Sequence, residues 1–363
     1  MTERQMLYGL SRLAFLTPNR FETLLEAEGS IEGVYNIEEK KLLQYGYSEE
    51  QVAKWKVLRH GQGQLSKIYH REVGQGIRFI SRSDKAFPEK LKPYSGCPLG
   101  LYVKGRLPDP QKPTVAMVGA RACSSYGRAM AKRFGRELAE AGVQVISGMA
   151  AGIDGICQQA ALSGGGESFG VLGCGVDVVY PRENYELYRK LEERGGLISE
   201  YVPGRPPLSY QFPARNRIIS GLCDCLIVVE AREKSGTLIT TNFALEQGKY
   251  IGAVPGRVGD RLSEGCNQLI QAGAFLIQNT EDILNILGIY LKTNEKIMKN
   301  PADSLASLEK TVYSCLDLCP KHLEEIVGEA ELPIPQVMEI LLTLELKGLV
   351  SRVGANEYVS KPE

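Results

Sequence analysis

Residues 114–154 read TVAMVGARACSSYGRAMAKRFGRELAEAGVQVISGMAAGID, and the rest of the chain is best interpreted from this stretch. An unbroken apolar run at 114–118 ends in glycine, a helical pattern follows over 126–141, and a second apolar run begins at Val143. Continuous apolar strands joined by helices are typical of a parallel sheet that is covered on both faces. The stretch therefore predicts a βαβ unit of a Rossmann-like doubly wound domain.

The same alternation continues on both sides of this unit. Strands are predicted at 77–80, 99–103, 114–119, 143–147, 168–173, 196–200, 225–230, 250–254 and 274–277. Helices are predicted between them at 126–141, 153–162, 214–221, 237–247 and 265–272. We therefore predict an α/β core with a Rossmann-like doubly wound parallel sheet over residues 71–289.

Two smaller modules are predicted beside this core. Residues 1–70 contain short helical patterns separated by glycine turns, which indicate a small helical module similar to SAM or helix-hairpin-helix modules. Residues 290–303 are polar and suit a linker. Residues 304–363 show three helical patterns followed by two short strands, which predict a winged-helix domain.

Charge is unevenly distributed along the chain, although 43 basic residues balance 43 acidic ones. Residues 71–301 hold 29 basic and 23 acidic side chains, whereas residues 302–363 hold 5 basic and 11 acidic ones. A basic core favours a polyanionic ligand. The acidic winged helix, whose third helix has a single lysine, Lys347, favours contact with protein over duplex DNA.

Several classes of protein are disfavoured by composition. The nine cysteines include no CxxC pair and the chain has three histidines, so we expect reduced thiols and no metal site or histidine triad. The N-terminus, MTERQ, lacks a signal-peptide pattern, and no stretch approaches the about 18 apolar residues of a membrane span. We therefore expect a soluble, cytoplasmic protein without a membrane span.

Glycine-rich loops follow five of the predicted strands. In a doubly wound sheet, ligands bind outside the carboxyl ends of the strands, where backbone amides and helix N-termini favour anions. A single glycine turn indicates a helix cap, but five at corresponding positions indicate an anion-binding edge. The loops lie at 119–127, 147–154, 173–177, 235–237 and 254–256.

The segment FPARNRIISG, residues 212–221, adds an aromatic ring and two guanidinium groups to these loops. An aromatic face can stack on a base, and arginine binds phosphate oxygens in pairs. Arg121 is expected to project into the same cleft. The alternative for Arg215 and Arg217 is an ion pair with Glu200 or Glu230 at neighbouring strand ends. A separate alternative for Phe212 is a place in the core, as is common for aromatic residues at loop entries.

These motifs resemble those of the DNA-processing protein A family, also called DprA or Smf. The resemblance covers about residues 77 to 285 in order, which makes chance a poor explanation. The matching stretches are VGAR 118–121, SG 147–148, GID 152–154, VLGCG 171–175, SE 199–200, FPARNRIISG 212–221, VVEA 228–231, SGTLIT 235–240 and AVPG 253–256.

The resemblance implies a non-enzymatic protein that binds single-stranded DNA, protects incoming strands during natural transformation and loads a RecA-type recombinase onto them. It implies DNA contacts at Gly119, Ala120, Arg121, Ser147, Gly148, Phe212, Arg215, Asn216, Arg217, Ser235 and Gly236. It also implies a homodimer, with Ile270, Gln271 and Leu276 at the interface, and no cofactor. Family members commonly carry serine at position 120 and histidine at position 158, where this chain has Ala120 and Gln158.

Two other functions remain open at this stage. Nucleoside-monophosphate phosphoribohydrolases use a related sheet with a glutamate in the Gly-Gly-x-Gly-Thr-x-x-Glu loop, but Thr240 follows Gly236–Ile239 here. Nucleotide binding would suit the glycines of residues 173–178, which match only the first part of the GxGxxG fingerprint. A third alternative is a scaffold whose acidic tail binds a partner while the cleft is vestigial, but the basic core argues against a vestigial cleft.

Overall fold

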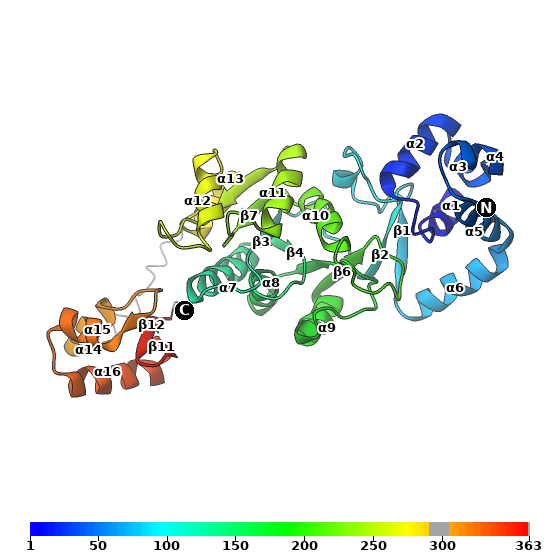
Figure 1. Ribbon diagram of the computed structural model, residues 1–363. Helices are drawn as coiled ribbons and strands as arrows, with labels where there is room; N and C mark the ends of the chain where they lie inside the picture. Colours follow the sequence, from blue (N-terminus) through cyan, green and yellow to red (C-terminus); the bar gives the residue numbers. More distant parts are fainter. Residues whose placement is uncertain (290–304, 362–363) are drawn as a thin grey trace.

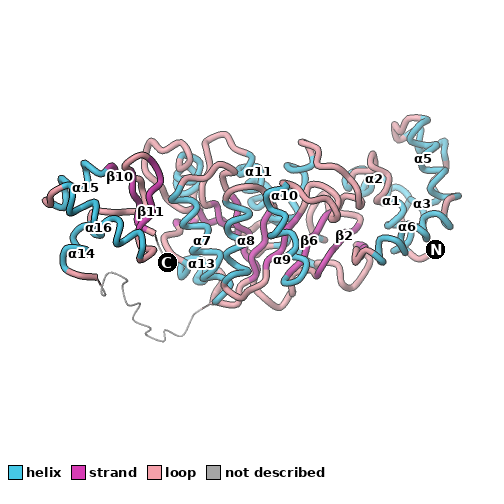
Figure 2. Tube along the Cα trace, turned by 90° about the horizontal axis from the view of Figure 1, so that it is seen from below, coloured by secondary structure: helices cyan, strands magenta, loops and turns pink. Residues whose placement is uncertain are grey.

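The computed structural model describes residues 1–289 and 305–361 of the chain. A helical module and a winged helix lie at opposite ends of a central sheet domain (Figure 1, Figure 2). The central sheet has nine strands in the order β1-β2-β6-β5-β4-β3-β7-β8-β9. In that order the strands are Arg78–Ser81, Gly100–Gly105, Gly195–Ser199, Ser168–Val171, Gln144–Ser147, Thr114–Val118, Cys225–Val228, Tyr250–Ala253 and Phe275–Leu276.

The seven neighbouring strands β6, β5, β4, β3, β7, β8 and β9 pair in parallel, which confirms the predicted doubly wound core. The edge formed by β1 and β2 differs from the prediction, because β1 pairs antiparallel with β2 and β2 pairs antiparallel with β6. A parallel neighbour needs a long crossover, usually a helix. The segment that joins β1 to β2 contains one short 3-10 helix, η1 (Glu89–Leu91), so the chain returns beside β1 in the opposite direction.

Helices cover both faces of the parallel part, and the alternation of side chains along β3 shows how. Val115 and Met117 pack on one face against α7 (Ser125–Glu140) and α8 (Ile153–Ser163). Ala116 and Val118 pack on the other face, against α10 (Gln211–Leu222) and α11 (Gly236–Glu246). The remaining helical elements of this domain are η2 (Arg182–Asn184), α9 (Tyr185–Arg194), α12 (Glu264–Gln271) and α13 (Thr280–Ile286).

The N-terminal module consists of six helices around the fully buried Trp55. They are α1 (Glu3–Leu10), α2 (Pro18–Glu28), α3 (Ile31–Asn36), α4 (Glu39–Gln44), α5 (Glu49–His60) and α6 (Gln62–Gly74). The core of the module continues into the sheet through Phe79 and Tyr102. Helix α6 ends at Gly74 and therefore runs across the predicted boundary at residue 70. The division of the chain into domains at residues 1–70 and 71–289 is a proposal.

The C-terminal region has the predicted three helices and a small antiparallel sheet, which confirms the winged helix. Val312, Ile326 and Leu341 form its core. The elements are α14 (Ser307–Ser314), β10 (Lys321–His322), α15 (Leu323–Ala330), α16 (Ile334–Leu346), β11 (Val350–Gly354) and β12 (Glu357–Ser360). The predicted linker, residues 290–303, lies outside the described residues.

All nine cysteines are free thiols. Within residues 1–289 and 305–361, no helix combines the length and apolar character that a membrane crossing requires. The same residues contain no cluster of three or more histidine, cysteine, aspartate or glutamate side chains with the geometry of a metal site.

Candidate nucleic-acid interface

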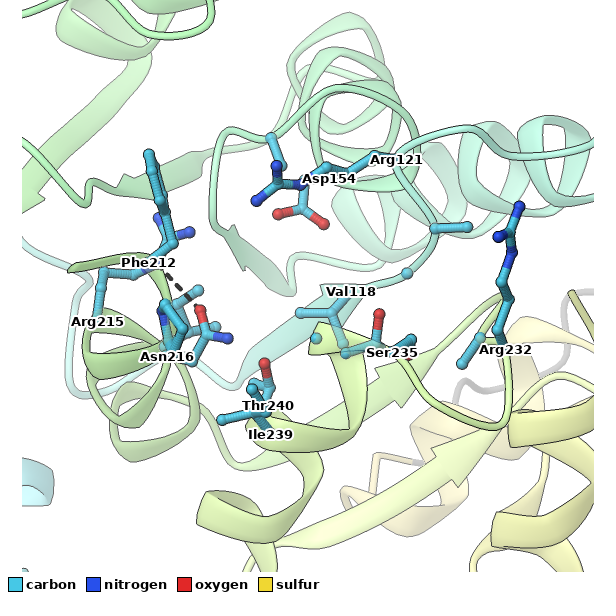
Figure 3. Close-up of a pocket in the computed structure, with 18 of the residues that line it drawn as sticks. Val118, Arg121, Asp154, Phe212, Arg215, Asn216, Arg232, Ser235, Ile239 and Thr240 are labelled. Atoms are coloured by element: carbon cyan, nitrogen blue, oxygen red, sulfur yellow. Dashed lines mark hydrogen bonds between the residues drawn. The ribbon is translucent and has the colours of Figure 1, made fainter. Parts of the chain in front are cut away.

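The order of strands reverses at β3, and this reversal positions the candidate site. From β3 the chain runs outward through β4, β5 and β6, and it then returns to place β7 on the other side of β3. Doubly wound sheets bind ligands in the crevice outside the carboxyl ends of the strands at such a reversal. A cavity of about 410 Å³ opens there, between the residues that follow β3 and those that follow β7 (Figure 3).

Eight of the eleven predicted contact residues line this cavity. They come from the loop after β3, the first half of α10 and the start of α11: Gly119, Ala120, Arg121, Phe212, Arg215, Asn216, Ser235 and Gly236. Gly148 lines a smaller pocket of about 100 Å³, which shares Arg121, Phe212 and Arg215 with the cavity. The hydroxyl of Ser147 is buried and donates to the carbonyl of Met117, so this side chain joins β4 to β3 instead of lining the cavity.

The loop after β3 is held from two sides. Gly152 has a left-handed φ of 78°, and a Cβ atom there would lie 2.3 Å from the carbonyl oxygens of Ala120 and Arg121. The loop can therefore pack directly on the backbone at the start of α8 only because residue 152 is glycine. At its other end, the carboxylate of Glu230 accepts hydrogen bonds from the amide and the hydroxyl of Ser124, the residue that caps α7. This packing fixes the position of Arg121.

A cation and an aromatic ring meet at the mouth of the cavity. The exposed guanidinium of Arg121 lies over the half-buried ring of Phe212, with its carbon 5.7 Å from the ring centre. The ring of Tyr180 lies beside it, 5.3 Å away between centroids. The ring of Phe212 packs against the backbone of Gly173. A Cβ atom at residue 173 would lie 2.8 Å from the Cδ1 atom of Phe212, so this close approach requires glycine. Together these groups offer a positive charge and a π-face side by side.

Arg215 forms a buried part of the cavity wall. Its side chain is 4% exposed and donates to the carbonyl oxygens of Gly148, at 2.8 Å, and Val171. Burial lowers the pKa of this guanidinium to about 10, so it stays protonated at neutral pH. Burial raises the pKa of the neighbouring Asp154, although Arg215 opposes that shift. The two side chains therefore influence each other through their charges, although no direct salt bridge joins these two described residues.

Arg217 points away from the cavity, because residues two positions apart on a helix do not share a face. Its guanidinium makes two hydrogen bonds to the carboxylate of Glu200, at 2.9 and 2.5 Å, and one to the carbonyl oxygen of Gly96. Burial alone lowers the pKa of Arg217, but Glu200 outweighs burial and raises it above its ordinary value. Arg217 and Arg215 therefore do not lie in one pocket, contrary to the prediction.

One residue of the cavity, Arg232, and one property of a predicted residue, Ser235, were not anticipated from the sequence. Arg232 is exposed and lies across the cavity from Phe212 (Figure 3). The sequence feature that could have indicated Arg232 is its position directly after the strand-end motif VVEA, which finishes at Ala231. The hydroxyl of Ser235 is buried, does not cap α11, and has no hydrogen-bond partner within the described chain. A free hydroxyl at a helix N-terminus suits an anion.

The two positions that depart from the resemblance differ in location. Ala120 lines the cavity, so the absent hydroxyl would have been close to a ligand. Gln158 is fully buried, and its amide nitrogen donates to the carbonyl oxygen of Phe169 at 2.9 Å. The side chain at position 158 therefore joins α8 to β5 in the core, away from the cavity.

The three residues predicted at a dimer interface lie at the far edge of the sheet. Ile270 is partly buried against the core, whereas Gln271 and Leu276 are exposed. Leu276 belongs to the edge strand β9 together with Phe275, and the side chains of these two residues are 44% and 47% exposed. The ring of Tyr250 packs against Phe275 with 6.0 Å between centroids, so this edge presents an apolar surface.

Comparison with known proteins gives consistent matches over this region. The family profile described as DNA recombination-mediator protein A matches residues 78–288, and that of the DprA winged helix domain matches residues 298–356. DNA processing protein DprA of Streptococcus pneumoniae is 43% identical over 221 residues, which cover 61% of this chain and 78% of the relative.

Two solved structures resemble the chain as well. The X-ray structure of DNA processing protein A from Streptococcus pneumoniae matches with a TM-score of 0.68 and 34% identity, covering 78% of this chain and 98% of that one. The structure of DNA processing protein A from Helicobacter pylori matches with a TM-score of 0.52 and 28% identity, covering 58% of this chain and 95% of that one.

Proposed function

The chain belongs to the DprA/Smf family of DNA recombination-mediator proteins, and from this premise we propose that it binds single-stranded DNA in the cavity between the ends of β3 and β7. The observation that carries the proposal is the exposed Arg121 guanidinium over the ring of Phe212, with Arg232 across the same cavity. The homologue from Helicobacter pylori, whose fold this chain shares, has been studied for its single-stranded DNA binding mode.

The mechanism that we propose is binding without catalysis. Arg121 and Arg232 would neutralise phosphates, Phe212 would stack on a base, and the start of α11 would add backbone amides and the free hydroxyl of Ser235. Stacking on any π-face gives little sequence preference. Such a protein could protect incoming strands in the cytoplasm during natural transformation and load a RecA-type recombinase onto them, as the family resemblance implies.

The phosphoribohydrolase alternative has less support from the cavity. Thr240, which takes the place of the glutamate of those enzymes, is 2% exposed at the cavity wall. Among the described residues that line the cavity, Asp154 is the one acid, and it accepts a hydrogen bond from the amide of Gly148 at 3.1 Å. Because that carboxyl group is 7% exposed and is held by the backbone of Gly148, it is engaged within the wall and is poorly placed to reach a substrate.

The proposal predicts tighter binding of single strands than of duplex DNA, with a marked salt dependence. Three or four neutralised phosphates give a slope of roughly −2 to −3 in a plot of log K against log salt, at about −0.7 per phosphate. Fluorescence anisotropy with a labelled strand of about 30 nucleotides and its duplex measures both properties. Arg121→Ala should flatten the slope by about 0.7.

Lys67→Ala is the matched control for this experiment, since Lys67 is an exposed cation on α6 in the N-terminal module. It should leave affinity and slope unchanged. Equal affinity for single and double strands, or binding that is insensitive to Arg121→Ala, would overturn the proposal. In that case hydrolysis of nucleoside monophosphates becomes the next activity to measure.

Replacement of Arg217 separates stability from binding. We expect Arg217→Met to lower the free energy of unfolding by about 1 to 3 kcal/mol, because Glu200 loses its partner in a largely buried site. Affinity for single-stranded DNA should stay within about twofold of wild type, since the guanidinium points away from the cavity. Urea unfolding and anisotropy on the same preparation test both statements, and a large loss of affinity at unchanged stability would place Arg217 in the binding site.

We also propose that the protein forms a homodimer through the edge of the sheet at β9. The exposed side chains of Phe275, Leu276 and Tyr250 form an apolar surface beside unpaired backbone groups of an edge strand. Native proteins usually cover such edges. A dimer would place two cavities on one DNA strand and increase avidity without new contacts.

The winged helix is proposed to contact protein and not duplex DNA. On α16, the helix that would enter a major groove, Ile334, Met338, Leu342 and Leu346 are 49% to 82% exposed at four-residue spacing. Glu339 and Glu345 are exposed on the same helix. An apolar stripe with acidic neighbours is unsuited to phosphate and base contacts.

A further inference from the structure

One exposed face of α7 carries three basic side chains at four-residue spacing. Arg128, Lys132 and Arg136 are all exposed, while Phe134 lies on the opposite, buried face of the helix. Residues four apart lie above one another on one face. In the part of the chain that the structure describes, Arg128 and Lys132 form no salt bridge, whereas Arg136 pairs with Glu140 at 2.8 Å.

This basic face is continuous with the proposed DNA cavity. A groove of about 730 Å³ runs along α7 and is lined on one side by Arg128, Lys132, Arg136 and Glu140 of that helix and on the other by α8. Arg121 lines both the groove and the cavity. A DNA backbone that leaves Phe212 past Arg121 therefore meets Arg128 next.

The surrounding charges distinguish Arg128 and Lys132 from Arg136 and from other basic positions on the domain. Comparable cations are neutralised by near neighbours: Arg133 by Glu137 at 3.0 Å, Lys104 by Glu192 at 2.6 Å and Lys112 by Glu167 at 2.8 Å. The far wall of the groove carries the acids Glu183 and Glu186. These acids repel phosphate, whereas the one acid of α7 in the groove, Glu140, is paired with Arg136, so a bound backbone would lie on the α7 side near Arg128 and Lys132.

We propose that the DNA strand held in the cavity continues along α7, where Arg128, Lys132 and Arg136 form a second phosphate-binding track. This inference rests on the proposed function of the cavity. From Arg128 to Arg136 the helix rises about 12 Å, which spans a few phosphates of an extended strand. The track contains exposed charges and no exposed aromatic side chain of α7. It would therefore bind the phosphate backbone of the DNA, with an affinity that does not depend on the base sequence.

The test uses the full chain and two oligothymidylates of about 6 and about 24 nucleotides, one that fits the cavity and one that extends beyond it. Arg128→Glu/Lys132→Glu should weaken binding of the long strand about tenfold at about 0.1 M salt and reduce its salt slope by about 1.4. Affinity for the short strand should change by less than about twofold. Lys40→Glu/Lys67→Glu, which makes the same change of charge at two exposed positions of the N-terminal module, should behave as wild type with both strands.

The outcomes separate this inference from the proposed function. If wild type binds neither strand, the proposed function fails and this inference fails with it. If wild type binds both strands and Arg121→Ala weakens binding, but the α7 variant matches the control with the long strand, the track alone is overturned. Equal losses for short and long strands would also overturn it. Arg128→Gln/Lys132→Gln repeats the measurement without charge reversal, and thermal unfolding of each variant checks the fold.

Discussion

Arg215→Ala is expected to lower the free energy of unfolding by about 3 to 5 kcal/mol, because it removes a buried side chain with its hydrogen bonds to two strand ends and a positive charge that acts on the buried carboxyl group of Asp154. Arg215 is 4% exposed and Asp154 is 7% exposed. The guanidinium also supplies hydrogen bonds to the carbonyl oxygens of Gly148 and Val171, at the ends of two neighbouring strands. Loss of this side chain therefore removes both a charge and the connection between β4 and β5 at the cavity.

The loss of stability in this variant should depend on pH in a defined direction. Burial already raises the pKa of Asp154 and Arg215 opposes that shift, so removal of Arg215 should raise it further. A carboxyl group whose pKa is higher in the folded than in the unfolded state stabilises the fold at low pH, and this stabilisation is lost as pH rises through the folded pKa. The difference in stability from wild type should therefore be largest near neutral pH and shrink in mild acid.

Urea unfolding of wild type and Arg215→Ala at about pH 7 and about pH 5 measures this difference. The double variant Arg215→Met/Asp154→Asn should recover most of the lost stability, since it removes both charges and keeps the volume of the side chains. A loss that is the same at both pH values and is not rescued by Asp154→Asn would show that the charge pair is not what stabilises the wall.

The position of the cavity was predictable from the sequence because it depends on strand order and strand ends. The apolar runs and the glycine loops at 119–127 and 235–237 were enough to place a ligand site at the carboxyl edge of the sheet. The antiparallel edge was not predicted, because an apolar strand carries no mark of its direction. That direction depends on the connection after β1, which lacks a crossover helix.

The roles of individual arginines were harder to predict, and α10 shows why. The sequence predicts a helix that begins at residue 214, with Arg215 and Arg217 in one pocket. In the structure the helix begins at Gln211, so Phe212 shares a face with Arg215 and Asn216, while Arg217 lies on the other side. Because α10 begins before Phe212, this ring and Arg215 lie on the helix face that lines the cavity, and Arg217 does not.

Phe212→Ala is expected to weaken binding of single-stranded DNA by about 5- to 150-fold, since stacking of one base on an aromatic ring contributes about 1 to 3 kcal/mol. The salt slope should not change, because no phosphate contact is removed. This pairing of a large loss in affinity with an unchanged slope is the opposite of what Arg121→Ala predicts. Anisotropy across a salt series therefore distinguishes the two groups, although they lie 5.7 Å apart.

Phe212→Leu and Phe212→Tyr decide whether the ring acts through stacking or through bulk. Leucine can still fill the space beside Gly173 and Tyr180 but has no π-face, so it should bind nearly as weakly as alanine. Tyrosine keeps the π-face and should bind within about threefold of wild type. Tyr45→Ala, which removes a 41% exposed ring of the N-terminal module, controls for the loss of any surface aromatic. Wild-type affinity in Phe212→Leu would mean that the side chain shapes the cavity wall and that the base is held by other groups.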